Sequence, residues 1–415
     1  MLDTQNSPPL YTPSPKTMRV GLISTYPPTR CGIGRFASSL VEAIDELDAA
    51  LDLQVVRLMN DLGKGTPPPE VVMEIDPESP VAIRAASRHL NRLDLTIVQH
   101  EFGIYGADEG RSALDLVSAI ETPKMVVLHT VLAEPNSNQR WIVESFAEEA
   151  TIIVLCESAA NLLQDRYSVP PDAIEIIRHG ARWSPQTVNE EPRRQMITWG
   201  LLGPGKGLER SIRAVASLRD ISPPVRYLIV GRTHPSVVAR HGYEYRHFLQ
   251  ALVEELGVED IVKFIDRYVS DDELFDLVSR SDLVVVPYDN HDQVSSGVIT
   301  EAAGLGRPTV ATRFPYSEEI LGEGAGLVVD HDEESLAHAM RTLMEDPVAY
   351  ARATRGARRL SLDFSWRKIA SDYLRLFQAR ARDADDSDLL AARVPGQAIR
   401  TRVADGGGAH SAPLG

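Results

Sequence analysis

The sequence contains only two cysteines, Cys31 and Cys156, among its 415 residues. Two thiols are too few for a disulfide scaffold, and the first residues show no secretory leader, so we expect a reducing, cytoplasmic environment. No run approaches the roughly 20 apolar residues of a membrane span, which predicts a chain without an integral membrane segment. HExxH, clustered Cys and His, and Asp-x-Asp at a strand end are also missing, so we expect no metal.

The sequence also has fewer basic than acidic residues. The chain has 43 Lys and Arg residues against 59 Asp and Glu residues, which gives a formal net charge of −16. A surface that binds nucleic acid needs an excess of basic side chains, so the composition argues against nucleic acid as a partner. We expect a neutral or small-molecule partner instead.

Short apolar runs alternate with amphipathic segments, and a chain of this length predicts about two domains. Nearly all-apolar strands that alternate with helices are typical of parallel sheets covered on both faces, so the predicted fold class is α/β with two Rossmann-like domains. The predicted strands are 19–24, 53–58, 94–99, 124–129, 151–155 and 174–179 in the first half, and 196–200, 226–231, 261–265, 282–288, 308–312 and 325–330 in the second.

A polar stretch, WSPQTVNEEPRR at about 183–194, separates the two sets of strands and is the expected linker. Flanking segments of low apolar content are expected to be disordered. The predicted organisation is a disordered lead at 1–17, an N-terminal domain at 18–185, a C-terminal domain at 195–362, a closing helix at 363–380 and a disordered tail at 381–415.

Ligands of an open parallel sheet bind beyond the carboxyl ends of its strands, so the loops there carry the candidate site. The loop after strand 19–24 places Gly32 and Gly34 before a helix, where backbone amides can approach an anion or a sugar closely. Gly32, Gly34 and Ala37 also match the dinucleotide fingerprint G-x-G-x-x-A, although the segment TYPPTRC separates them from the strand. A dehydrogenase and a plain turn therefore stay open here.

The loop GLLGPGKGLERSI, residues 200–212, places Lys206 and Gly207 at the start of a helix. The helix dipole disfavours a lysine at that position unless an anion shares the site, so the loop favours a phosphate ligand. A solvated lysine on a glycine-rich turn is the alternative interpretation.

The segment 292–312 is the most specific of the candidate ligand-binding loops. On a helix, Glu301 falls on the same face as an apolar stripe, and ribose hydroxyls would supply the partners that such a carboxylate needs. The amides near Ser295, Ser296 and Gly297 would lie at the helix N-terminus, where they could take phosphate or sugar oxygens. A glutamate at the edge of the stripe that reaches water is the alternative.

Two histidines, His100 and His129, end predicted strands of the first half. A histidine at a strand end is more often a structural hydrogen-bonding group than a catalyst, but two that face one cleft favour a functional role. Both interpretations stay open.

These features, in this order, resemble the retaining GT-B glycosyltransferases of family four. The resemblance rests on the N-terminal glycine loop, a strand-end histidine, G-x(5)-K-G at 200–207 and E-A-x-x-x-G-x-P-x-V-A-T at 301–312, and it covers about residues 18 to 380. It implies the GT-B fold, with two parallel sheets that face an interdomain cleft and a last helix, here FSWRKIASDYLRLF, that crosses back to the first domain.

The resemblance also implies the roles of individual residues. Lys206 and Gly207 would hold the donor diphosphate, Glu301 the ribose, and Ser295, Ser296 and Gly297 the phosphate or sugar oxygens. His129 would line the catalytic centre, and Gly32 and Gly34 would lie near the transferred sugar's phosphate or the acceptor. Glu319 matches the family more weakly.

Two positions depart from the family pattern. Leu201 stands where the family has an arginine, so Arg232 or Arg313, both at strand ends, would have to supply the second cation for the diphosphate. Gln293 replaces the first glutamate of the family's pair; its amide can hydrogen-bond sugar hydroxyls at the catalytic centre but cannot stabilise developing positive charge.

The implied activity is metal-independent transfer of a hexose, commonly mannose or glucose, from a UDP-, GDP- or ADP-sugar to a saccharide or small-molecule acceptor, with retention and without a cofactor. A nucleotide-sugar epimerase and a catalytically silent nucleotide-sugar binding protein are the open alternatives, because fold does not decide between them.

Overall fold

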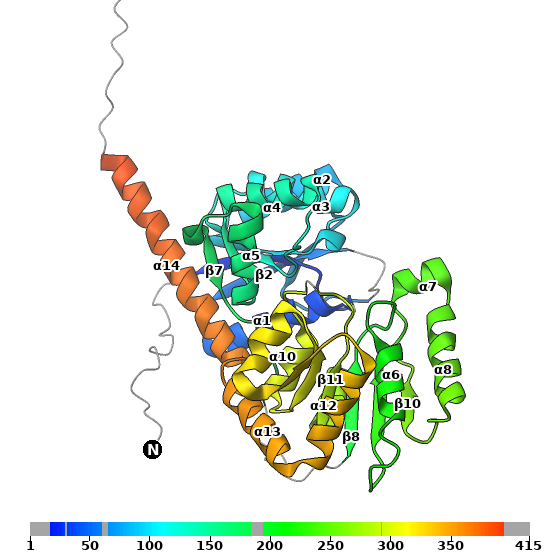
Figure 1. The fold of residues 1–415 in the computed structure, drawn as a ribbon. Helices are drawn as coiled ribbons and strands as arrows, with labels where there is room; N and C mark the ends of the chain where they lie inside the picture. Colours follow the sequence, from blue (N-terminus) through cyan, green and yellow to red (C-terminus); the bar gives the residue numbers. More distant parts are fainter. Residues whose placement is uncertain (1–16, 30, 60–64, 184–193, 292, 394–415) are drawn as a thin grey trace, which may run out of the picture.

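Two parallel sheets, one in each half of the chain, organise the computed structural model, which describes residues 17–29, 31–59, 65–183, 194–291 and 293–393 (Figure 1). Nearly all of the expected lead, most of the expected linker and the end of the expected tail lie outside these residues. None of the helices in the described part combines the length and the apolar character needed to cross a membrane.

The first sheet has seven strands among the described residues, in the order β3-β2-β1-β4-β5-β6-β7, and all of its neighbouring strands pair in parallel. Its strands are β1 (Arg19–Ser24), β2 (Asp52–Leu58), β3 (Val71–Ile75), β4 (Leu95–His100), β5 (Lys124–Leu128), β6 (Thr151–Val154) and β7 (Ile174–Ile176). Its helices are α1 (Gly32–Leu47), α2 (Pro80–Leu90), α3 (Ala107–Ala119), α4 (Ser137–Glu149) and α5 (Glu157–Tyr167), with short 3-10 turns η2 (Phe102–Ile104) and η3 (Pro171–Ala173).

The second sheet repeats the same winding with six described strands in the order β10-β9-β8-β11-β12-β13, again all parallel. Its strands are β8 (Gln195–Trp199), β9 (Arg226–Val230), β10 (Val262–Ile265), β11 (Leu283–Val286), β12 (Thr309–Thr312) and β13 (Gly326–Val329). The following helices are α6 (Leu208–Ala216), α7 (Pro235–His241), α8 (Glu244–Leu256), α9 (Asp271–Arg280), α10 (Gly297–Gly304), α11 (Pro315–Ile320), η4 (Leu321–Ala325), α12 (Glu333–Glu345), α13 (Pro347–Ser361) and α14 (Trp366–Arg393).

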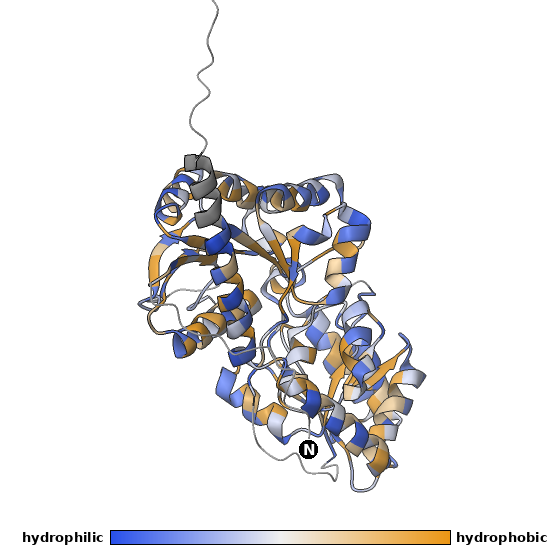
Figure 2. Cartoon of the chain, turned by 90° about the vertical axis from the view of Figure 1, so that its left-hand side faces the viewer, coloured by the Kyte–Doolittle hydropathy of each residue, from blue (hydrophilic) through white to orange (hydrophobic). Residues whose placement is uncertain are grey.

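The predicted fold class is confirmed, and every predicted strand is present within a few residues. β3 was not predicted; it lies at the sheet edge, where its residues alternate between partly buried and exposed positions before the buried Ile75. Central strands such as β4 and β11 are buried at every position, because helices cover both faces of each sheet. Figure 2 shows the consequence: the strands are predominantly apolar, whereas the surrounding helices carry hydrophilic positions on their outer sides.

The closing helix α14 leaves the second unit and runs along the first, where it packs against α1 (Figure 1). Its residues Ile369, Tyr373 and Phe377 share one buried cluster with Phe36 and Leu40 of α1. The expected boundary at residue 380 was wrong, because the helix continues to Arg393. Residues 381–393 contain neither glycine nor proline, and their four alanines, two leucines and two arginines favour helix over the four aspartates among them.

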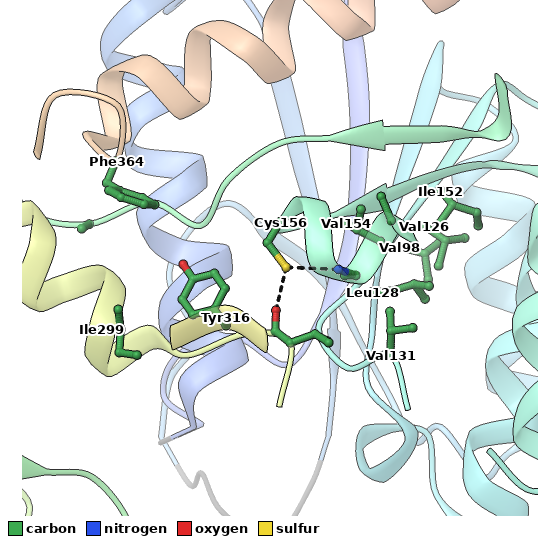
Figure 3. Packing of buried hydrophobic residues seen from close by; sticks show 14 of the residues in the cluster. Val98, Val126, Leu128, Val131, Ile152, Val154, Cys156, Ile299, Tyr316 and Phe364 are labelled. Atoms are coloured by element: carbon green, nitrogen blue, oxygen red, sulfur yellow. Dashed lines mark hydrogen bonds between the residues drawn. The ribbon is translucent and has the colours of Figure 1, made fainter. Parts of the chain in front are cut away.

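Apolar contacts also join the two units near their interface. One buried cluster contains β-strand residues of the first unit together with Ile299, Tyr316 and Phe364 of the second (Figure 3). Within it, the Cys156 thiol donates a hydrogen bond of 2.8 Å to the carbonyl of Val294. Burial raises the pKa of Cys156 to about 12, so the thiol keeps the proton that this bond requires.

Replacing Phe377 with alanine tests the docking of α14. Phe377 is fully buried against α1, so Phe377→Ala should lower the free energy of unfolding by about 3–5 kcal/mol through lost burial and the cavity left behind. Arg367→Ala, at an exposed position of the same helix, should change it by less than about 0.5 kcal/mol. Urea denaturation measures both, and equal midpoints for the two variants would contradict the packing described.

Candidate functional site

A cleft of about 430 Å³ lies where the carboxyl edges of the two sheets meet. The first unit contributes the start of α1 and the segment after β7, and the second contributes the loops after its strands β8, β9, β10 and β11 together with α10. Trp366, at the start of α14, closes one side. The cleft is therefore built from both halves of the chain.

Most of the predicted site residues lie in this one cleft. Those that line it are Gly32, Lys206, Arg232, Gln293, Ser295, Ser296, Gly297 and Glu301. Gly34, Gly207 and His129 do not line the cleft. They shape the backbone of neighbouring turns or pack against residues that line it, as described below. In particular, Lys206 and Glu301, on which the sequence interpretation depends, share one cavity.

Glu301 on α10 has an ionic partner that the sequence did not indicate. Arg35 of α1 donates from Nη2 to Oε1 of Glu301 at 2.9 Å, and its Nε lies 3.1 Å from Oδ1 of Asp271. Burial raises the pKa of Glu301, and the positive charge of Arg35 opposes this rise. The carboxylate expected to hold a ribose is thus bound across the cleft by a guanidinium of the first unit.

Lys206 lies in the turn before α6, with its Nζ 4.1 Å from the centre of the Tyr288 ring. The ring face attracts the ammonium group and holds it at the cleft without neutralising it. Gly207 caps α6 with φ of +60°, and a Cβ there would lie 1.8 Å from the carbonyl oxygen of Pro287. Glycine is therefore required for the turn that places Lys206.

The loop before α10 is held from two sides. Gln293 donates from its side-chain amide to the carbonyl of Ser295 at 2.7 Å, and the Ser295 hydroxyl donates to the carbonyl of His129 at 2.9 Å. Ser296 caps α10 by accepting from the amide of Ile299. The first amides of α10, at Gly297 and after it, thus start at the cleft, where a helix N-terminus favours an anion.

The histidines differ from expectation. His129 does not line the cleft: its ring packs edge-on against Phe36, and its Nε2 lies 2.7 Å from Oε1 of Gln99. His100 is fully buried and also lies outside the cleft. Burial lowers the pKa of each to about 3, so both are neutral at physiological pH. The strand positions were predicted well, but the chain turns Phe36 over the ring of His129.

His179 takes the lining position instead. It follows β7, its Nδ1 donates to the carbonyl of Gly180 at 2.6 Å, and its Nε2 lies close to Gly297 at the start of α10. Burial lowers the pKa of His179 to about 4, which leaves a neutral ring whose Nε2 can accept a hydrogen bond. The signal was available in the sequence, since His179 ends a predicted strand just as His100 and His129 do.

The two arginines considered as a second cation for the diphosphate lie in different places. Arg232 follows β9 and lines the cleft, and its side chain has no hydrogen-bond or ion-pair partner among the described residues. Arg313 lies outside the cleft and pairs with Glu318 and Asp330, so the suggestion that it serves the site was wrong. Leu201 lines the cleft and leaves its side of the phosphate loop uncharged.

Gly34 and Glu319 have structural partners. The amide of Gly34 donates to the thiol of Cys31, which caps α1. Glu319 reaches across the interface and accepts from the amides of Glu157 and Ser158 at 3.1 and 2.9 Å, so it caps α5 of the first unit. Within the described residues, no group of three or more His, Cys, Asp or Glu side chains is placed to hold a metal ion.

Comparison with known proteins assigns the second half of the chain to a family. Glycosyl transferases group 1 matches residues 181–360, a range that contains Lys206, Arg232 and Glu301. Residues 181–360 form a group 1 glycosyltransferase domain. The prediction of this family from the phosphate loop and the segment 301–312 is thereby confirmed.

Similarity to curated proteins agrees with the assignment of this domain. A D-inositol 3-phosphate glycosyltransferase of Salinispora tropica is 29% identical over 266 residues, which cover 59% of this chain and 54% of that protein. A glycogen synthase of Mycobacterium tuberculosis is 26% identical over 294 residues, which cover 65% and 66%. The chain thus spans only about half the length of the Salinispora relative.

Solved structures show the same two-unit fold. HepE of Anabaena, in complex with UDP and glucose, has a TM-score of 0.67 at 16% identity, over 87% of this chain and 100% of that one. Sucrose-phosphate synthase of Thermosynechococcus elongatus also has a TM-score of 0.67, at 18% identity, over 91% and 100%. These similarities place the fold around the group 1 glycosyltransferase domain in the GT-B class.

Gly207→Ala tests the geometry of the phosphate loop. The left-handed φ and the predicted 1.8 Å contact with Pro287 should force the turn to move and should lower the free energy of unfolding by at least about 2 kcal/mol. The matched control is Gly103→Ala, where no atom lies within 4 Å of the added Cβ and a change below about 1 kcal/mol is expected. Thermal melting of the two variants measures the difference, and a Gly207→Ala protein as stable as the control would show that the turn is described incorrectly.

Proposed function

We propose that the protein transfers a hexose from a nucleoside-diphosphate sugar to an acceptor, with retention and without a metal ion. The observation that carries the proposal is the convergence of Lys206 and Glu301 on one cleft between the two sheets. An ammonium group in the turn before α6, in a cleft that the N-terminus of α10 also lines, suits a diphosphate, and a half-buried carboxylate suits the vicinal hydroxyls of a ribose.

Each group has a task in such a reaction. Negative charge grows on the diphosphate oxygens as the bond to the sugar breaks, and Lys206 together with the first amides of α10 would stabilise it. Arg232 would supply the second positive charge in place of Leu201, since its side chain lies free at the cleft. Three aromatic rings that line the cleft, those of Trp366, Phe36 and His179, would shield the reacting sugar from water.

The acceptor would bind on the side of the first unit, where Gly32 and His179 line the cleft. The names of the relatives suggest two classes to test, a phosphorylated cyclitol and a glucan. We propose a small hydroxylated molecule of one of these classes as the acceptor.

A silent nucleotide-sugar binding protein is the second candidate, and two positions favour it. Leu201 removes one cation from the phosphate loop, and the amide of Gln293 is engaged with the carbonyl of Ser295. Both changes would weaken the chemical step more than donor binding. Saturable donor binding without turnover on any acceptor would support this second candidate.

A thermal-shift panel with UDP-, GDP- and ADP-glucose and GDP-mannose tests the proposed function. A donor that binds the native state alone should raise the melting temperature in a concentration-dependent way. The stabilising donor is then incubated with inositol phosphate or a short glucan, with and without EDTA, and the anomeric configuration of the product is read by NMR. No stabilisation by any of the donors would contradict the proposal.

Lys206→Gln tests the role of the ammonium group. Loss of a charged hydrogen bond to the diphosphate should weaken binding of the stabilising donor by about tenfold or more, measured by calorimetry. Lys263→Gln, at an exposed position on β10 outside the cleft, is the matched control and should bind as the wild type does. Equal affinities for the two variants would remove Lys206 from the site.

A further inference from the structure

The side chain of Arg35 reaches from the first unit to acidic groups of the second. It lies in the first turn of α1, and its guanidinium contacts Glu301 on α10 and Asp271 on α9 at 2.9 and 3.1 Å. All three side chains line the cleft. The contact to Glu301 joins residues 266 positions apart in the chain, so it exists only when the two units face each other.

The chemistry of this contact allows a third participant. A carboxylate has about four lone-pair sites, and Arg35 engages Oε1 of Glu301 through a single nitrogen, so a hydroxyl can bind the same carboxylate. The guanidinium is planar and always charged, and its second contact, to Asp271, holds it in one orientation. Arg35 therefore orients the carboxylate and leaves its remaining lone pairs available to a hydroxyl.

We propose that Arg35 is a positioning residue for the donor: it orients the carboxylate of Glu301 for the ribose hydroxyls, so that the donor site is complete only when the first unit is seated against the second. This inference rests on the proposed function. It names a residue outside residues 181–360 as part of the nucleotide-binding apparatus, and it makes donor affinity depend on the arrangement of the two units.

The charges that face Glu301 support this role. Burial raises its pKa, Asp271 of α9 raises it further, and Arg35 of α1 and Arg182 of the segment after β7 lower it. Without Arg35, only the hydrogen bond from the Trp199 side chain and the charge of Arg182 oppose burial and Asp271. Glu301 would then take up its proton at a higher pH, and a protonated carboxyl accepts ribose hydroxyls less well.

The alternative is that Arg35 is only an interdomain clasp. Arg178 provides the comparison, since it pairs with Glu323 across the same interface at 3.6 Å and lies outside the cleft. If Arg35 only holds the two units together, replacing Arg35 or Arg178 should weaken donor binding to a similar degree. A positioning residue predicts an effect of Arg35 alone, together with a changed pH dependence.

The experiment compares Arg35→Gln, Arg35→Lys and Arg178→Gln with the wild type, using whichever of UDP, GDP and ADP the wild type binds most tightly by calorimetry. Circular dichroism and melting confirm that each variant is folded. Arg35→Gln should bind about tenfold more weakly at neutral pH, and its affinity should fall at a higher pH than that of the wild type as the solution is acidified. Arg35→Lys should restore part of the affinity, and Arg178→Gln should bind as the wild type does.

The outcomes separate the inference from the proposed function. If the wild type binds none of the three nucleotides, the proposed function fails and the inference falls with it. If the wild type binds but Arg35→Gln shows the same affinity and pH profile, only the inference is overturned. Equal weakening by Arg35→Gln and Arg178→Gln, without a change in the pH profile, also overturns it and leaves a general clasp. If Arg35→Gln does not fold, Arg35→Lys decides: its pH profile must differ from that of the wild type for the inference to stand.

Discussion

The structure depends on one constraint: every strand of both sheets is parallel, and the carboxyl edges of the two sheets meet at one cleft. Backbone amides and loop side chains at such an edge are left for ligands, because the strands themselves are covered by helices. Lys206 comes from the loop before α6 and Glu301 from helix α10 of the same unit, yet both reach this edge. The site thus follows from strand direction before any particular side chain is considered.

A second consequence is that the loop before α10 is held by hydrogen bonds from the first unit as well as by its own unit. Its carbonyl at Val294 accepts from Cys156, and its hydroxyl at Ser295 donates to the carbonyl of His129. Glu319 caps α5 from across the interface, and α14 returns to pack on α1. The hydrogen bonds at Val294 and Ser295 tie the shape of the loop to the first unit, so under the proposed function donor binding would be coupled to the arrangement of the two halves.

Electrostatics inside the cleft run against the acidic composition of the chain. Arg35, Lys206 and Arg232 all line it, whereas the formal net charge of the protein is −16. The nearby histidines contribute no charge, because burial lowers the pKa of His129 and of His179 well below neutrality. The positive charge that the cleft offers to a ligand therefore comes from Lys206 and Arg232 together with the helix N-termini, since Arg35 is paired with Glu301 and Asp271.

The sequence by itself determined the α/β class, the strand positions and the turn that holds Lys206, because apolar periodicity and glycine conformation are local properties. The edge strand β3 escaped, since its sequence VVMEI is apolar but lacks the strict alternation of apolar and polar residues that marks a half-buried strand. Only the tertiary structure decided that His179 and not His129 lines the cleft, that Arg313 lies elsewhere and that Arg35 binds Glu301. The lining by His179 and the contact of Arg35 depend on how the two sheets face each other, whereas Arg313 is held by Glu318 and Asp330 of its own unit. None of these contacts leaves a periodic pattern in a single chain.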